Sequence, residues 1–277
     1  MNRVRVIARL TFQEAVRKQL VTMAFIAGAA FLLLFGVAFH FQAVSLAKQD
    51  AHIFARHEAL NSFEMLGLYA IDFLIVAITV LTSVETLSGE IASGTIHAVA
   101  TRPLSRWELY LGKWIGLCAV LTVYAVVMIG GITLESLMLG GTVPRHLTAG
   151  FGLIWLQSML LLSVTLLFST ICSTLTAGVS VLGLHGLAFL GGWIEQAGAF
   201  THTPQAVLAG VAASVLMPSE SLWRRAVYEM QSPIVTALNH TPFAGISVPT
   251  GAMVVYAVLY TVALIGVGLW RFGGRDL

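Results

Sequence analysis

The run LVTMAFIAGAAFLLLFGVAFHF, residues 20–41, decides the fold, because it contains no Asp, Glu, Lys or Arg and is long enough to cross a bilayer. A helix needs roughly 20 apolar residues to span the hydrocarbon core. Five further runs pass this test, and we expect six spans at about 20–41, 65–87, 110–134, 150–172, 176–197 and 250–270. All six are predicted to be helical, since backbone polar groups in lipid must be satisfied within the segment. The alternation of a barrel strand is absent.

The composition also indicates a membrane protein. Of the 277 residues, 57% are apolar and 10% are charged, whereas a soluble domain carries about a quarter charged residues. The net charge of +2 is too small to indicate a nucleic-acid partner. We therefore predict one all-α transmembrane domain over residues 1–277, whose surroundings are the lipid bilayer.

The distribution of basic residues predicts the orientation. With six spans both termini lie on one side, and that side carries ten of the fifteen Lys and Arg residues, namely Arg3, Arg5, Arg9, Arg17, Lys18, Arg102, Arg106, Lys113, Arg271 and Arg275. The opposite loops carry Lys48, Arg56, Arg145, Arg224 and Arg225. Because cytoplasmic loops are enriched in basic residues, we expect both termini in the cytoplasm.

Residues 1–19 predict an amphipathic helix lying at the membrane interface. Helical spacing gathers one largely apolar face, consisting of Val4, Ile7, Ala8, Thr11, Phe12, Ala15 and Val16. A basic membrane anchor and a partner-binding helix are both compatible with this pattern. The apolar run that follows is too long for a signal peptide, so we expect the first span to be retained. Cys118 and Cys172 lie within predicted spans, which argues against a disulfide.

The connections between spans differ in character. Residues 40–64 are polar and are predicted to form an outer loop, in part helical. Residues 172–177 are predicted to form a short turn between two antiparallel spans. The outer segment 198–249 holds five of the seven prolines. Within it, residues 204–217 are apolar but too short to span, and residues 218–230 have one apolar face. We expect two short helices there, re-entrant or lying at the outer interface.

The segment SGEIASGTIHAVATRPLSRWELYLGKW, residues 88–114, is unusually polar for this chain. Gly89 and Gly94 weaken a continuous helix, Pro103 disfavours helix at Arg102, and Ser105-Arg-Trp-Glu108 has the spacing of a capping box. We expect a new helix to begin at about Arg106. Between these breaks, residues 90–100 are predicted to form one short helix that begins at Glu90 and presents Ile91, Ile96 and Val99.

The same segment resembles the signature of the permeases of ABC type-2 transporters. That signature has an acidic residue, Gly-Thr, a small apolar helix, Pro-x-Ser-Arg, a second acidic residue and Leu-Gly-Lys. Nine positions match in order, namely Glu90, Gly94, Thr95, Pro103, Ser105, Arg106, Glu108, Gly112 and Lys113. The resemblance extends over the whole chain, and it is closest to the subgroup that includes the permease of the nitrous oxide reductase maturation system.

The resemblance implies a transport subunit of the bacterial cytoplasmic (inner) membrane that works as an exporter. The helix at 90–100 would be a coupling helix that docks on a separate ATP-binding subunit, present in two copies, while a second permease subunit, a copy of this chain, completes the complex. ATP and Mg would be held by the partner, and no cofactor by this chain. The coupling residues would lie in the segment 88–109 and beside it, namely Glu85, Glu90, Ile91, Gly94, Thr95, Ile96, Arg102, Pro103, Ser105, Arg106, Glu108 and Lys113.

The chain lacks the motifs of an enzyme. No G-x-x-x-x-G-K-[ST] occurs, so we do not expect it to hydrolyse ATP itself, and the H-E-x-x-H, G-x-S-x-G and C-x-x-C motifs are also missing. The eight histidines are scattered without a ligand spacing, which argues against a metal site. We expect His185 to be a helix-packing residue.

Several charged residues of the spans are ambiguous. Asp72 lies inside the second span, where it would either contact a substrate or ion, or pack near the outer interface or between protomers. Glu85, Glu135 and Glu195 lie at span ends and are predicted to be solvated. We expect Lys113 to reach the headgroups with its ammonium, and the outer pair Arg224 and Arg225 to lie on a solvated helix face. The glycines of the fifth span would allow close helix approach, namely Gly178, Gly183, Gly186 and Gly191.

Two other functions remain compatible with the sequence. A membrane anchor or assembly subunit would need the spans but not a rigid helix at 90–100. A secondary transporter would show inverted repeats and paired intramembrane charges, which we do not find. The sequence does not define the transported substrate.

Overall fold

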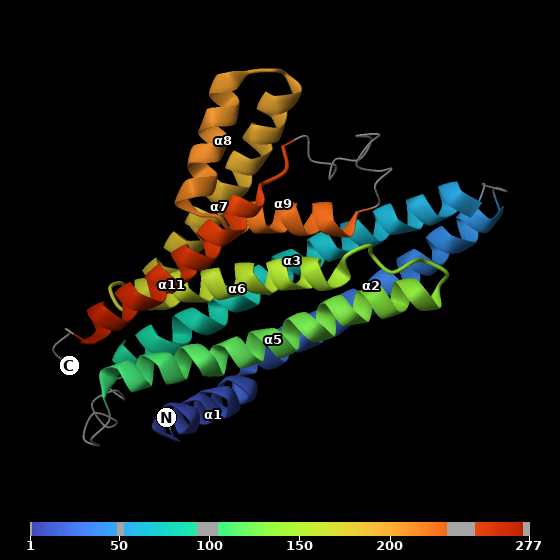
Figure 1. The fold of residues 1–277 in the computed structure, drawn as a ribbon. Coiled ribbons are helices and arrows are strands. Elements are labelled where there is room, and N and C mark those ends of the chain that lie inside the picture. The colour runs from blue at the N-terminus through green and yellow to red at the C-terminus, as the bar shows by residue number, and fades with distance from the viewer. Residues whose placement is uncertain (1, 49–52, 93–104, 232–246, 274–277) are drawn as a thin grey trace.

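The structure, a computed structural model, describes residues 2–48, 53–92, 105–231 and 247–273, and in these ranges it is built of helices without strands. Within these ranges, the N-terminal helix α1 (Asn2–Arg17) precedes six helices of spanning length and apolarity. These are α2 (Gln19–Lys48), α3 (Ile53–Ala92), α5 (Arg106–Met138), α6 (Leu147–Ser169), α7 (Thr174–Phe200) and α11 (Gly251–Gly273). Figure 1 shows the arrangement, and the predicted all-α fold with six candidate spans is confirmed.

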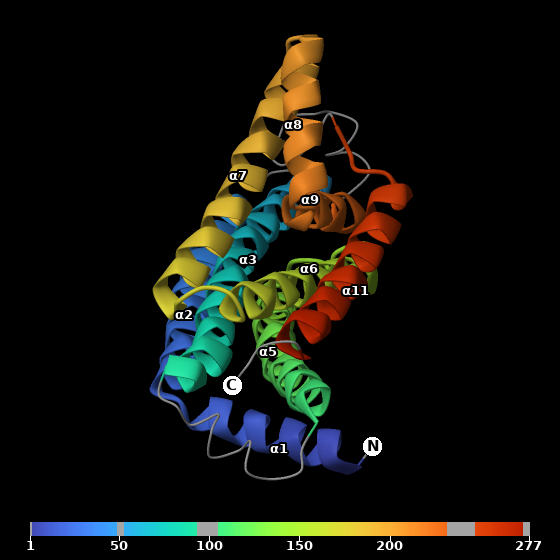
Figure 2. The same ribbon diagram turned by 90° about the vertical axis from the view of Figure 1, so that its left-hand side faces the viewer.

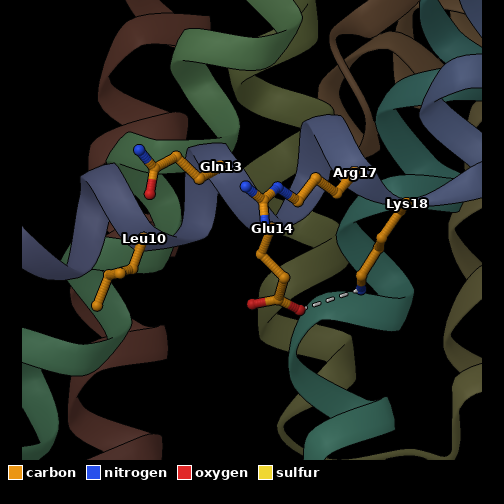
Figure 3. Close-up of a pocket in the computed structure, with 5 residues that line it drawn as sticks. All are labelled: Leu10, Gln13, Glu14, Arg17 and Lys18. Carbon is orange, nitrogen blue, oxygen red and sulfur yellow. Dashed lines mark ion pairs between the residues drawn. The ribbon is translucent and has the colours of Figure 1, made fainter.

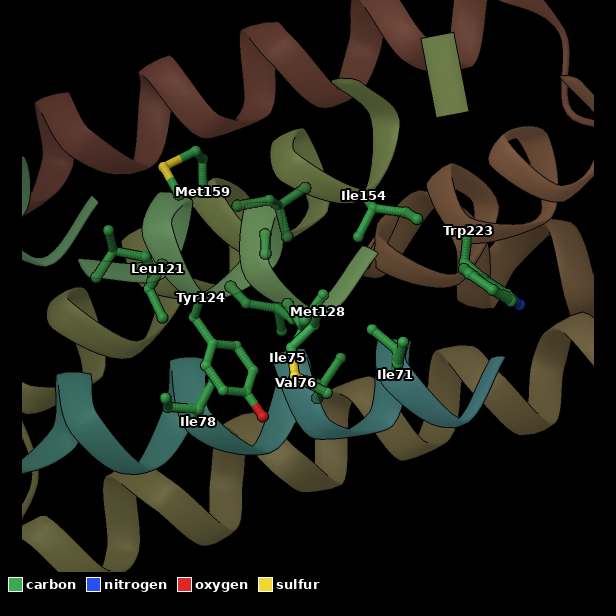
Figure 4. Close-up of a cluster of buried hydrophobic side chains, with 14 of the residues drawn as sticks. Ile71, Ile75, Val76, Ile78, Leu121, Tyr124, Met128, Ile154, Met159 and Trp223 are labelled. Carbon is green, nitrogen blue, oxygen red and sulfur yellow. The ribbon is translucent and has the colours of Figure 1, made fainter. Parts of the chain in front are cut away.

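Helices α3, α5 and α6 form the centre of the bundle. In the most apolar 18-residue stretch of each of these helices, 61%, 50% and 67% of the residues are buried. The corresponding share is 17% in both α2 and α11. Figure 4 shows side chains of the central helices meeting in one cluster, among them Ile75, Tyr124 and Ile154. Because lipid is as apolar as these side chains, their packing rather than their removal from water stabilises the contact. The outer faces of α2 and α11 are left for lipid or for another subunit.

Hydroxyl side chains inside the central helices satisfy themselves locally. In α3 the hydroxyls of Thr79, Thr82, Ser83 and Thr86 each donate to the carbonyl four residues earlier, at 2.5–2.7 Å. Ser163 and other hydroxyl residues of α6 do the same. These hydroxyl side chains can therefore be buried in the central helices without leaving their O–H donors unsatisfied.

The polar segment 40–64, predicted as an outer loop that is in part helical, is helical wherever the structure describes it. Helix α2 continues to Lys48 and α3 already begins at Ile53. The requirement for roughly 20 apolar residues detects only the part of a helix that lies in lipid. Both helices continue beyond that part into the polar segment. One consequence is that Glu64, placed in the loop by the sequence, is fully buried within α3 and accepts a hydrogen bond from Ser136 of α5 at 2.7 Å.

Two short helices follow α7, as the sequence predicts. Helices α8 (Pro204–Leu216) and α9 (Ser219–Met230) meet at an angle of 105°. Figures 1 and 2 show α8 lying along the end of α7 that projects from the bundle, while α9 turns back over α6. Of the predicted close-contact glycines in α7, Gly191 faces Ala213 of α8, whereas no described atom lies within 4 Å of a methyl group built on Gly183 or Gly186.

A buried ion pair holds these helices to the end of α7. The Arg224 guanidinium donates to Glu195 at 2.8 Å and also to Ser214 of α8 and the Ser247 carbonyl. Ser247 Oγ donates to the same carboxylate of Glu195. The side chains of Arg224 and Glu195 are only 10% and 6% exposed. The prediction that both would be solvated was therefore wrong, since each provides the partner that makes burial of the other tolerable. Glu135 is also half-buried rather than solvated, against Gly36 of α2.

Replacing Arg224 should destabilise the protein strongly. In Arg224→Met the buried carboxylate of Glu195 loses its partner, and such a loss costs about 3–5 kcal/mol. The adjacent Arg225 is a matched control, because its pair with Glu229 is more exposed, at 27% and 20% of the two side chains. Thermal unfolding in detergent should show a much smaller effect for Arg225→Met and partial recovery in Arg224→Met combined with Glu195→Gln. Equal effects of the two single changes would contradict this assignment.

Candidate functional site

The signature segment connects the ends of two neighbouring central helices. Helix α3 ends at Ala92, and α5 begins at Arg106. Five predicted coupling residues, Gly94, Thr95, Ile96, Arg102 and Pro103, lie outside the described residues. Glu90 and Ile91 are found in the last turn of α3. The end of α3 and the start of α5 thus lie at the same end of the bundle, next to α1 (Figure 2).

The predicted break at Gly89 does not exist. Helix α3 runs through Gly89 to Ala92, so Glu90 ends this helix and does not begin a separate one. A single glycine costs only about 1 kcal/mol in a helix interior, which does not by itself end a helix. The remainder of the predicted helix, residues 93–100, lies outside the described residues.

The capping box at Ser105 is confirmed. Ser105 has an extended backbone conformation, and its backbone N–H donates to Oε2 of Glu108 at 3.1 Å. These contacts fix where α5 begins, because they satisfy amide groups that have no partner within the helix. Beside the cap, the Arg106 guanidinium donates to the Gly273 carbonyl at the end of α11, at 3.4 Å. The first turn of α5 is therefore bonded to the last span.

Lys113 joins α5 to α3. Its ammonium donates to the backbone carbonyl of Thr86 at 3.0 Å, and the residue is only 4% exposed. The prediction that this lysine reaches the headgroups was wrong, because the carbonyl of a neighbouring helix satisfies its charge within the protein. The bond lies between one and two helical turns from the end of α3 and from the start of α5. Thr86 precedes Ala92 by six residues, and Lys113 follows Arg106 by seven.

Two glycines of α5 allow α1 to lie directly on that helix. A methyl group at Gly112 would come within 2.5 Å of Ile7, and one at Gly116 within 2.7 Å of the Ala8 carbonyl. Of the predicted apolar face of α1, Ile7, Ala8, Thr11 and Ala15 are buried, Val4 and Phe12 are half-buried, and Val16 is exposed. The face was predicted correctly, and the structure shows that it packs on protein. The spacing Gly112-x-x-x-Gly116 is the signal that the sequence analysis overlooked.

Glu85 lies beside the junction of α1 and α2. The ammonium of Lys18 lies 3.7 Å from Glu14 and 4.0 Å from Glu85, whose side chain is 48% exposed. Figure 3 shows Glu14 and Lys18 directed toward one another at this surface. Exposed pairs of this kind contribute at most about 1 kcal/mol. Glu85 is thus solvated as predicted, and it is placed next to α1.

Asp72 lies far from this end, buried between α3 and α6. Gln157 donates to its Oδ2 at 3.3 Å, and its Oδ1 has no hydrogen-bond partner among the described residues. The residue packs inside the protein, and a role in a transport pathway stays a prediction. His185 is a packing residue as predicted, because its Nδ1 lies 2.9 Å from Ser219 Oγ. Within the described ranges no three His, Cys, Asp or Glu side chains gather as a metal site would require.

The chain belongs to the ABC-2 transporter family. The model of the ABC-2 family transporter protein matches residues 5–277, which is nearly the whole chain. Together with the six candidate spans, this defines a multi-pass membrane permease subunit of an ABC transporter, as the signature residues indicated. Among curated proteins no match to the chain is found. The subgroup suggested by the sequence stays a prediction.

The packing of α1 on α5 can be tested by adding a single methyl group to Gly116. Gly116→Ala should push the Ala8 carbonyl away, loosen α1 and lower the thermal unfolding temperature in detergent, because a backbone carbonyl cannot move aside as a flexible side chain can. Gly130→Ala in the same helix is the control, since nothing lies within 4 Å of its added methyl group. Limited proteolysis of α1 should increase only in the first variant. If both variants match the wild type, α1 does not pack on α5 through these glycines.

Proposed function

We propose that the chain is the permease subunit of an ABC exporter, driven by ATP that separate nucleotide-binding subunits hydrolyse. The segment 88–109 would be the docking and coupling element, two ATP-binding subunits would hold the ATP and Mg, and two copies of this chain would form the membrane part. The observation that carries this proposal is that residues in the first turns of α5, just after residues 93–104, connect this helix to α3, α11 and α1.

These bonds would convert a local push into a movement of the bundle. Lys113 connects α5 to α3, Arg106 connects α5 to α11, and Gly112 seats α1. A displacement of residues 93–104 by a nucleotide-binding subunit would therefore act on four helices at once. Rigid-body movement of packed elements is a common means by which an energy source changes access to a site.

The orientation and the assembly are part of the proposal. Basic residues near the α1 end, including Arg17 and Arg106, support a cytoplasmic location of that end in the bacterial inner membrane. In the most apolar stretch of α2 and of α11 only 17% of the residues are buried, which leaves exposed faces on which a second copy can pack. Export is the direction that the family resemblance favours.

A coupling variant should uncouple the two subunits. The chain is co-purified with a candidate ATPase, and ATPase activity is compared in wild type, Glu90→Arg, Gly94→Trp and Lys113→Met. We expect the first two changes to prevent complex formation. Lys113→Met should preserve the complex but reduce transport-coupled ATP hydrolysis about tenfold, because a hydrogen bond to a charged group contributes about 1.5–3 kcal/mol.

Lys48→Met is the control, because Lys48 is an exposed lysine at the last residue of α2. It should leave both complex formation and ATP hydrolysis unchanged. If Glu90→Arg and Gly94→Trp also leave both unchanged, the segment does not couple the subunits, and a membrane anchor becomes the better account.

A further inference from the structure

A groove between α2 and α3 has the form of a binding site for one phospholipid. Its volume is about 670 Å³, and it is lined mainly by apolar residues of these two helices, among them Met23, Ala27, Leu74, Ala77 and Leu81, with Tyr124 of α5 contributing to the wall. Lys18 and Glu85 are the charged lining residues, and they lie at the end of the groove where α1 meets α2. The groove is thus apolar along its length and charged at one end.

The length of the groove matches one leaflet of a bilayer. Along α2 it extends from Lys18, the residue just before this helix, to Ala27, and along α3 from Leu74 to Glu85. At a rise of 1.5 Å per residue these stretches are about 14 and about 17 Å long. Half of a hydrocarbon core of about 30 Å is about 15 Å. A chain lying in the groove would therefore extend from the headgroup level to the middle of the membrane.

A second, polar hollow adjoins the charged end. It is formed by one side of α1 and is lined by Gln13, Glu14, Arg17 and Lys18, together with Leu10 (Figure 3). Lys18 lines both the polar hollow and the apolar groove. The two hollows together offer a polar site followed directly by an apolar site, which is the order of chemistry along a phospholipid.

The charges at the junction indicate which headgroup fits. Arg17 and Lys18 provide two positive charges, and Glu14 and Glu85 provide two negative charges. Cationic side chains can bind a phosphate, and the carboxylates can accept hydrogen bonds from a primary ammonium. We propose that this junction binds a phospholipid with a primary-ammonium headgroup, a phosphatidylethanolamine, with an acyl chain in the groove between α2 and α3. This site is distinct from the coupling contacts of Lys113 and does not depend on the proposed function.

Native mass spectrometry of the delipidated full chain tests the proposal. The protein is titrated separately with dioleoylphosphatidylethanolamine, dioleoylphosphatidylcholine and dioleoylphosphatidylglycerol. We expect one ethanolamine lipid per chain to bind first and at least about tenfold more tightly than the other two. Choline cannot donate hydrogen bonds to the carboxylates, and the glycerol headgroup has no cation for them.

Two variants separate the headgroup from the acyl chain. Ala77→Phe fills the groove and should weaken binding of the ethanolamine lipid at least about tenfold, since two buried methylene groups already correspond to such a change. Glu14→Gln combined with Glu85→Gln should remove the preference for the ethanolamine lipid, because these two carboxylates are the acceptors for its ammonium. Leu259→Phe is the control on the exposed side of α11, where Leu259 is 63% exposed, and should bind lipid as the wild type does. Elution volume and thermal unfolding confirm that each variant is folded.

Three results would overturn the proposal. Equal binding of the three lipids to the wild type would show an ordinary annular contact. An equal loss in Leu259→Phe and Ala77→Phe would show that the groove is not the site. Dissociation of a dimer by Ala77→Phe, with lipid binding unchanged, would assign the groove to a contact between two copies of the chain.

Discussion

The contact on which the α1 end of the bundle depends is the bond from the Lys113 ammonium to the Thr86 carbonyl. A lysine that is only 4% exposed in a membrane helix needs a partner within the protein, and a backbone carbonyl of α3 provides it. Because the bond joins the helices on either side of residues 93–104, it fixes the separation between the end of α3 and the start of α5. The preceding residue, Gly112, brings α1 against the same helix. Two adjacent residues thus place three helices.

The two ends of the bundle are held by different chemistry. At the α1 end, close backbone approach and carbonyl bonds connect α1, α3, α5 and α11, and exposed ion pairs add little. At the other end, the buried pair of Glu195 and Arg224 gathers α7, α8, α9 and the residues before α11 around one carboxylate. A buried pair resists the loss of either partner strongly. The first arrangement can move as a unit, whereas the second fixes the short helices in place.

The sequence predicted what depends on local chemistry. The six candidate spans and the start of α5 at Ser105 follow from length and capping, and the structure confirms them. Periodicity located the apolar face of α1 but assigned it to the membrane interface, whereas the structure packs it on α5. The partners of charged residues were not predictable, because Lys113, Glu195 and Arg224 find their partners in other helices. The same limitation hid Glu64, whose burial depends on Ser136, 72 residues further along the chain. The continuation of α3 through Gly89 was missed because one glycine weakens a helix by only about 1 kcal/mol and need not end it.

The proposed coupling requires that α1 and α5 move as one body when ATP is hydrolysed on the partner. It can be measured by pulsed electron spin resonance with labels at Gln13 of α1 and Leu134 of α5, both exposed, after replacement of Cys118 and Cys172 by serine. The reconstituted complex is compared without nucleotide and with Mg-ATP and vanadate. We expect the distance distribution within one chain to stay the same while that between Leu134 of the two copies changes. A change in the distance from Gln13 to Leu134 within one chain would contradict the account.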